Sequence, residues 1–357
     1  MTPERKPATV YRPPSTVVLV VVLGAALAIG APEAKAQGAT GAFARIGFGA
    51  RGIGAGNAGV ADRHVSPYYN PAFAPLAERE NLAASAALLS FDRGLQYLQF
   101  GAPLEPSAGV AFGLTHASVS EIDGRDASGY HTQTLSTDEY QVFAAFGLRL
   151  SERVSAGLAA KFYRADYGLD GVDPAQDAVG FDLGVSAQVT DRLALGLAAT
   201  DLLANFEWDT SGQYENREGR LTTDRLPLRL RLGGAYRFLD GKARLLAEYE
   251  ARLSWREERA VTTVTREDGT PRDVTQEETT LRRGDHLRVG TTYRPAWEIL
   301  TLRAGIDRLL SETMARPTAG FSVRQDIGRL PVSAGYSAAF ERGPGTTMHV
   351  FTLRLFL

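Results

Sequence analysis

The sequence predicts an all-β fold: a transmembrane antiparallel β-barrel of about 14 strands with an N-terminal plug or hatch segment in its lumen. Three observations favour this fold. Apolar residues recur at every second position along most of the chain, short and long connections alternate, and an export leader comes first. We expect a cleaved signal peptide at 1–36, the plug or hatch segment at 37–80 and the barrel at 81–357.

The composition excludes several classes of protein. The 357 residues include no cysteine, so the chain has no disulfide framework, no thiolate nucleophile and no cysteine-bound metal. The formal net charge is -2, which provides no basic field for nucleic acid, so we expect no nucleic-acid partner. Hydrophobic residues make up 44% of the chain, which argues against intrinsic disorder.

The first 36 residues have the pattern of a secretory signal peptide. Basic residues precede an apolar run from Val17 to Ile29, and Ala34-Lys35-Ala36 forms a small-x-small cleavage site before Gln37. The run is shorter than the ~20 residues of a membrane-spanning helix, so an uncleaved anchor is the less favoured alternative. An exported chain of this kind is either a soluble periplasmic protein or an outer-membrane barrel.

Alternation with a period of two decides between these possibilities. Val179, Phe181, Leu183 and Val185 alternate with small or polar residues, as expected of a strand with one apolar face. About 14 segments of this kind are long enough to cross a bilayer as tilted strands. They lie at 83–91, 94–101, 108–118, 138–150, 154–166, 178–189, 193–206, 226–238, 243–255, 286–294, 297–306, 317–325, 330–341 and 346–357.

The connections between these segments sort by length. Links after even-numbered strands are short turns, at 151–153, 190–192, 239–242 and 295–296. Links after odd-numbered strands include long polar stretches, at 118–137, 167–177, 207–225 and 256–285. This pattern is typical of outer-membrane barrels, with periplasmic turns and longer outer loops, whereas a soluble sandwich has no reason to sort its loops this way.

Aromatic residues are placed as two interfacial girdles would require. Trp208 and Trp255 fall at outer strand ends, and Trp297 falls at the periplasmic end with Tyr293 and Phe238. We therefore expect membrane lipid as a partner of the outer face and a location in the bacterial outer membrane. The final strand, which ends Phe356-Leu357, is expected to engage the barrel-insertion machinery, although its last residue is not the usual aromatic.

The segment before the first strand is rich in glycine. Gly54, Gly56 and Gly59 match the dinucleotide pattern G-x-G-x-x-G, but Pro67 and Pro71 interrupt the stretch after it and no βαβ unit surrounds it. We reject a nucleotide site and expect no cofactor. Glycines with positive φ that pack tightly in the barrel mouth or lumen explain the pattern better.

This segment resembles the N-terminal signature of the PorV/PorQ family of outer-membrane barrels, which is related in architecture to FadL-type transporters. The resemblance covers residues 49–72 by motif and the barrel by pattern. It implies fourteen strands and, as in the FadL type, a segment with Asn-Pro-Ala folded into the lumen. The motif residues are Arg51, Gly52, Gly54, Gly56, Asn57, Gly59, Asn70, Pro71 and Ala72.

Charged residues concentrate on the inward face of two neighbouring strands. The predicted lumen charge network consists of Arg229, Arg231, Arg237, Arg244, Glu248, Glu250 and Arg252. Arginine and glutamate on adjacent strands pair across the ladder, so the network either braces the wall and holds the N-terminal segment or forms a path for ions or carboxylates. Only Phe143, Tyr163 and Leu98 are expected to make the inward face apolar.

Catalytic and metal chemistry have little support. None of the five histidines has an evident serine or aspartate partner, and neither G-x-S-x-G nor H-E-x-x-H occurs, so we expect no enzyme. Asp170, Asp173 and Asp177 would suit calcium, but they miss the spacing of a dedicated loop, and a plain polar loop is favoured. We expect no metal site.

The family resemblance implies the leading functional hypothesis, a non-enzymatic barrel that docks or passes exported proteins at the cell surface, as in type IX secretion. FadL-like uptake of hydrophobic small molecules, such as long-chain fatty acids, is the alternative. A structural or adhesive barrel that acts through its outer loops is a third possibility. Secretion partners and hydrophobic molecules are therefore both candidate partners.

Overall fold

The computed structural model describes residues 41–167, 175–209, 221–265, 271–296, 298–310, 315–341 and 346–357. In these residues, fourteen strands form one closed barrel and two more form a separate hairpin. The barrel strands are β1 (Asn81–Leu89), β2 (Arg93–Leu104), β3 (Ala108–Arg125), β4 (His131–Arg149), β5 (Val154–Asp166), β6 (Ala175–Gln188), β7 (Leu193–Leu202), β10 (Leu228–Phe238), β11 (Ala243–Thr265), β12 (Pro271–Tyr293), β13 (Leu300–Asp307), β14 (Arg316–Ile327), β15 (Leu330–Phe340) and β16 (Thr347–Phe356).

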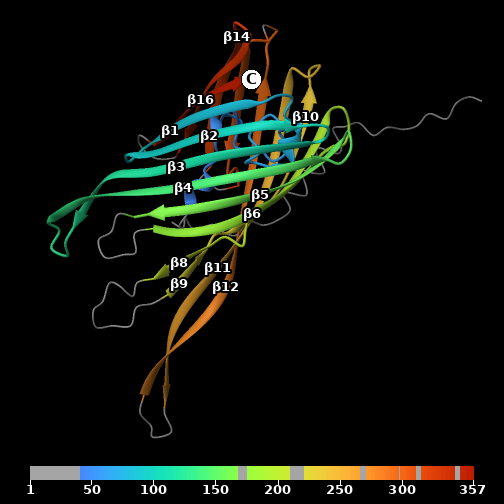
Figure 1. Ribbon diagram of the computed structural model, residues 1–357. Helices are drawn as coiled ribbons and strands as arrows, with labels where there is room; N and C mark the ends of the chain where they lie inside the picture. Colours follow the sequence, from blue (N-terminus) through green and yellow to red (C-terminus); the bar gives the residue numbers. More distant parts are fainter. Residues whose placement is uncertain are drawn as a thin grey trace, which may run out of the picture. The chain divides into compact units, whose positions relative to one another are not determined.

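Each barrel strand pairs antiparallel with the next barrel strand along the chain. The ring closes where β1 pairs with β16, with Asn81 opposite Phe356 (Figure 1). The hairpin of β8 (Asn205–Asp209) and β9 (Leu221–Arg225) interrupts the order, so β7 pairs with β10. Closure leaves no open sheet edge and confirms the predicted fourteen-stranded antiparallel barrel.

The outer face of the barrel is apolar. On β6, Val179, Phe181 and Leu183 are 51%, 42% and 53% exposed, whereas Asp182 between them is 1% exposed. The same alternation recurs on other strands, which places large hydrophobic side chains outside and mostly small or polar ones inside. So regular an apolar outer face is typical of outer-membrane barrels, in agreement with the predicted location.

Two of the predicted outer loops are largely strand. The stretch 118–137 belongs mostly to β3 and β4, and the described parts of the stretch 256–285 belong to β11, which runs to Thr265, and β12, which begins at Pro271 (Figure 1). The stretch 207–225 contains β9 and the end of β8. The prediction of a loop at 118–137 was wrong because most side chains of this ribbon are exposed on both faces, so its sequence does not alternate.

The interfacial aromatics are described only in part. Trp255, Phe238 and Tyr293 are exposed at 37%, 37% and 43%, as the predicted girdles require. The side chains of Trp208 and Trp297, together with the predicted signal peptide and residues 37–40, lie outside the described residues. Among the helices of the described ranges, none is sufficiently long and apolar to span a bilayer.

Residues 41–80 precede β1, and the buried part of this stretch packs against inward positions of the wall strands. Residues 41–80 contain three short helices, η1 (Ala42–Arg45), α2 (Gly49–Gly54) and η2 (Pro71–Leu76). Their backbone contacts inward side chains around the ring, including Thr318 of β14 and Thr352 of β16. We refer to residues 41–80 as the N-terminal segment.

Candidate functional site

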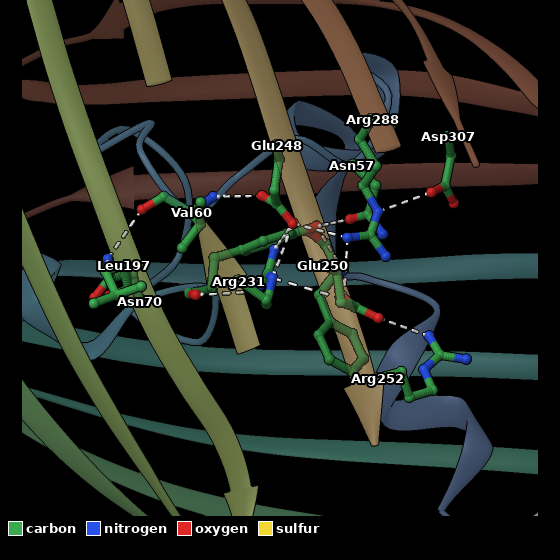
Figure 2. Close-up of polar contacts among 12 residues, drawn as sticks. Asn57, Val60, Asn70, Leu197, Arg231, Glu248, Glu250, Arg252, Arg288 and Asp307 are labelled. Atoms are coloured by element: carbon green, nitrogen blue, oxygen red, sulfur yellow. Dashed lines mark hydrogen bonds and ion pairs between the residues drawn. The ribbon is translucent and has the colours of Figure 1, made fainter. Parts of the chain in front are cut away.

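A network of ion pairs crosses the interior of β10 to β13 (Figure 2). Arg231 donates to Glu248 through Nη2 at 2.7 Å. Arg288 donates through Nη1 to Glu248 at 2.8 Å and to Glu250 at 3.0 Å, and through Nε to Asp307 at 2.8 Å. All five side chains are buried, so these charge-assisted hydrogen bonds act where water does not compete.

Two further arginines extend this central network. Arg252 donates to Glu250 at 2.8 Å, and Arg316 donates to Asp307 at 2.7 Å. Arg288, Asp307 and Arg316 were missed by the sequence-based prediction, which was confined to β10 and β11. Each of these residues is charged, which is the sequence signal that could have identified them. Asp307 and Arg316, however, lie at the outer ends of strands, where the alternation does not distinguish an inward-facing residue from a loop residue.

The remaining members of the predicted lumen charge network lie apart. Arg229 pairs with Asp201 at 2.7 Å, and Arg244 pairs with Asp62 of the N-terminal segment at 2.9 Å. Arg237 does not join the network, because its Nη2 donates to the backbone carbonyl of Asp191 in a turn. Arg237 instead lines a cavity near the strand end together with Arg244 and Asp62.

A second group of buried charges surrounds Lys161 of β5. Its Nζ contacts Asp182 at 2.7 Å and Asp201 at 3.1 Å, and it lies 4.6 Å from the ring centre of Tyr68. Tyr163 donates to Asp201 at 2.6 Å. The sequence analysis did not single out this group, whose charged members come from the consecutive strands β5, β6 and β7 and whose Tyr68 comes from the N-terminal segment.

The central network also holds the N-terminal segment. Glu248 accepts a hydrogen bond from the backbone N–H of Val60 at 2.8 Å, and Arg231 donates to the carbonyl of Tyr69 at 3.1 Å. Glu248 therefore accepts hydrogen bonds from Arg231 and Arg288 and, at the same time, from the backbone N–H of Val60 in the N-terminal segment. This arrangement favours the bracing interpretation of the charges over an ion path.

The Asn-Pro-Ala motif contacts two wall strands. Asn70 Nδ2 donates to the carbonyl of Val60 at 2.9 Å (Figure 2) and to those of Val185 and Leu197 at 3.1 and 3.4 Å. Asn70 Oδ1 accepts from Ala72 N–H at 3.1 Å. The asparagine side chain therefore joins the segment to β6 and β7 and also caps η2. The carbonyl of Ala72 accepts from the Ser155 hydroxyl at 2.8 Å.

More of the motif glycines are required for close packing than for a positive φ angle. Gly56 adopts φ 68°, as predicted, and Asn57 next to it adopts φ 59°. Gly52 and Gly59 do not, but a Cβ at either position would lie 2.3 Å from the nearest ring or hydroxyl atom of Tyr69. The Tyr69 ring is thus clamped between two glycines, and its hydroxyl donates to Asn57 Oδ1 at 2.7 Å.

Glycines of the barrel wall face the N-terminal segment in turn. A Cβ at Gly196 would lie 2.0 Å from the Val60 carbonyl oxygen, and one at Gly290 would lie 2.0 Å from that of Ala55. Gly157 meets the Pro71 carbonyl in the same way, at 2.4 Å. The wall has no room for side chains at these points because the backbone of the segment occupies it.

The lumen also contains an aromatic cluster of Phe48, Tyr68, Tyr97 and Phe143. The rings of Phe48 and Tyr97 stack at 4.9 Å, and Tyr68 packs edge-on against Phe48 at 4.5 Å and Phe143 at 5.5 Å. The prediction that Leu98 faces inward was wrong: Leu98 is 46% exposed and its neighbour Tyr97 is buried. The run Leu95 to Phe100 has apolar residues in both phases, so its facing could not be read from the pattern.

The charge of the N-terminal segment is concentrated at Asp62. Burial would raise the pKa of Asp62, but the neighbouring Arg244 and Arg51 oppose it and hold this pKa below its usual range. The segment therefore carries an ionised Asp62 at pH 7.

Two histidines have aspartate partners that are not evident in the sequence. His116 Nε2 lies 2.7 Å from Asp138 Oδ1, and His131 Nδ1 lies 2.6 Å from Asp123 Oδ1. All four side chains are substantially exposed on β3 and β4. Each pair joins adjacent strands, so the partner of each histidine depends on the register of the hairpin.

Within the described part of the chain there is no candidate metal site, because no three histidine, cysteine, aspartate or glutamate side chains converge there. Asp170 and Asp173, which were weighed as calcium ligands, lie outside the described residues. Asp177 lies 3.8 Å from Arg164 in a partly exposed ion pair.

Comparison with solved structures shows the same fold. The chain resembles the CymD monoaromatic hydrocarbon channel, with 12% identity, a TM-score of 0.57 and coverage of 87% of this chain and 96% of the other. It resembles the Pseudomonas putida toluene transporter TodX with 14% identity, a TM-score of 0.54 and coverage of 87% of this chain and 96% of the other. For a Pseudomonas aeruginosa FadL homologue the identity is 16%, the TM-score is 0.50, and the coverage is 86% of this chain and 97% of the other. No family model and no curated protein sequence matches the chain.

Proposed function

We propose that this outer-membrane barrel passes small hydrophobic molecules across the membrane and that the N-terminal segment is its plug. Support comes from the neighbours of the same fold, which are described as monoaromatic hydrocarbon channels and a toluene transporter. The FadL-like alternative thus gains support, whereas the PorV/PorQ resemblance and its docking role gain none.

The aromatic cluster is the observation that carries this proposal. Phe48 and Tyr68 come from the N-terminal segment, and Tyr97 and Phe143 come from β2 and β4, so the rings line the contact between segment and wall. Flat aromatic molecules bind favourably among offset or edge-on rings. The N-terminal segment therefore enlarges the apolar surface in the lumen beyond what the wall strands provide.

Buried charge and the aromatic cluster meet at Tyr68, whose ring centre lies 4.6 Å from Lys161 Nζ. The central network is fixed by charge-assisted hydrogen bonds, which makes it a poor path for an apolar molecule. The aromatic cluster is held by packing and by few hydrogen bonds, such as that from the Tyr68 hydroxyl to the Ala44 carbonyl at 2.9 Å. We infer that passage requires the segment to move away from the wall at this cluster.

Uptake of labelled toluene by cells that produce the chain tests the proposal. The cells should accumulate toluene faster than cells without it, and Phe143→Gln should reduce the rate severalfold, because it keeps the side-chain length but removes the ring. Tyr140→Gln is the matched control, since Tyr140 lies on the same strand and faces outward. Equal uptake with and without the chain, or equal effects of both variants, would contradict the proposal.

A further inference from the structure

A cavity of about 270 Å³ lies between the N-terminal segment and the strands that meet around β16. Its charged lining is strongly unbalanced, with five arginines against one glutamate: Arg51, Arg294, Arg303, Arg324, Arg354 and Glu298. Its apolar lining includes Phe48, Val65 and Tyr97. The cavity is separate from the central network, whose residues do not line it.

Arg303 is the most informative residue of this cavity. It is 4% exposed, and its Nη2 donates to Ser322 at 2.8 Å. Its Nε and Nη1 are buried and have no hydrogen-bond partner among the residues that the structure describes. A buried guanidinium with two unused donors is costly unless a ligand or water accepts from them.

The neighbouring arginines add positive charge to the cavity, and the contacts described for two of them do not neutralise it. Arg354 donates to the His64 carbonyl at 3.3 Å, and Arg324 lies 4.9 Å from the Phe356 ring, so neither of these contacts is with a carboxylate. Arg51 is crowded by like charges: burial, followed by Arg303 and Arg354, lowers the pKa of Arg51 well below its usual value. An anion would relieve this repulsion and complete the hydrogen bonding of Arg303.

We propose that this cavity binds an oxyanion, a carboxylate or phosphate group, with Arg303 as its principal donor and Arg354 and Arg51 as supporting charges. The planar fork of a guanidinium matches the spacing of two oxygens in either group. Phe48 and Val65 provide a surface for a compact apolar body attached to the anion. The site does not depend on the proposed uptake function.

Calorimetry on the purified full chain in detergent tests this proposal, with inorganic phosphate and benzoate as separate probes at constant ionic strength. At least one probe should bind the unaltered chain at one site, and the one that binds identifies the source of the anion. Arg303→Gln should weaken binding at least about tenfold, the loss expected when one charge-assisted hydrogen bond is removed. Arg329→Gln is the control, since Arg329 is exposed in the adjacent β14–β15 turn.

Arg324→Gln provides a second variant at an exposed position of the lining and should weaken binding by a smaller factor. Heat-modifiable migration of each variant establishes that the barrel is folded. The proposal is overturned if neither probe binds, or if the folded Arg303→Gln and Arg324→Gln variants bind as tightly as the control. Benzyl alcohol, which lacks the charge, should not bind at this site.

Discussion

Gly196 lies on the inward face of β7 directly against the backbone of Val60. Because a Cβ there would lie 2.0 Å from the Val60 carbonyl oxygen, Gly196→Ala must displace the N-terminal segment or the strand. We expect a loss of about 1–3 kcal/mol, the usual cost of overpacking. Trypsin should also cleave the segment faster at Arg63.

Gly234→Ala is the matched control for this substitution. Gly234 belongs to the neighbouring β10, and a Cβ there would meet only ordinary contacts, the nearest at 3.6 Å from Leu195. Urea unfolding in detergent gives the free energy, and limited proteolysis gives the position of the segment. Equal stability and equal cleavage of the two variants would show that the segment does not occupy the space in front of Gly196.

Asp62 gives the segment a dependence on pH. Its pKa is held below the usual value of about 4, so it stabilises the fold above pH 4, and this contribution is lost as the pH falls towards the folded-state pKa. Between pH 6 and pH 3 the unaltered chain should lose about 1 kcal/mol more than Asp62→Asn, measured by urea unfolding. An identical loss in both proteins would show that Asp62 is not ionised against Arg244.

At the scale of elements, the strands that touch lipid were predictable and the outer ribbons were not. Along β6 every second residue faces lipid, so the alternation in the sequence reports the facing directly. Beyond Val119 on β3 and before Thr137 on β4 the pairing continues, but the side chains on both faces are exposed. Without a buried face the sequence carries no alternation to read.

The exposed ribbon predicts that the outer part of β3 and β4 does not stabilise the barrel. Replacement of residues 120–136 by a two-residue Asn-Gly turn should leave heat-modifiable migration unchanged and should alter the free energy of unfolding by less than about 1 kcal/mol, because little apolar surface is lost. A variant that fails to form a barrel in detergent would show that this ribbon is needed for folding. Deletion of residues 140–146 from the lipid-facing part of β4 serves as the positive control.

For the whole molecule, the sequence predicted a closed barrel and the lengths of its turns. It did not predict which side chains of the wall contact the N-terminal segment in the interior. Pairing of arginine with glutamate across neighbouring strands was predicted, and Arg231 with Glu248 is such a pair, whereas Arg252 and Glu250 pair on one strand. Contacts such as Arg244 with Asp62 join residues far apart in the chain, and a pattern of period two contains no information about them. Of the aromatic cluster, only Phe143 was predicted to face inward, since half of the cluster comes from the segment.

Because the chain contains no cysteine, passage through the lumen past a movable segment can be tested by a single cross-link. A Cβ at Gly335 would lie 3.4 Å from the Ala50 Cβ, close to the spacing that a disulfide requires. The measurement is toluene uptake by cells with the Ala50→Cys, Gly335→Cys double variant, under oxidising and then reducing conditions, with each single variant as control. We predict that oxidation stops uptake and reduction restores it, and uptake that continues with the segment fully cross-linked would contradict this account.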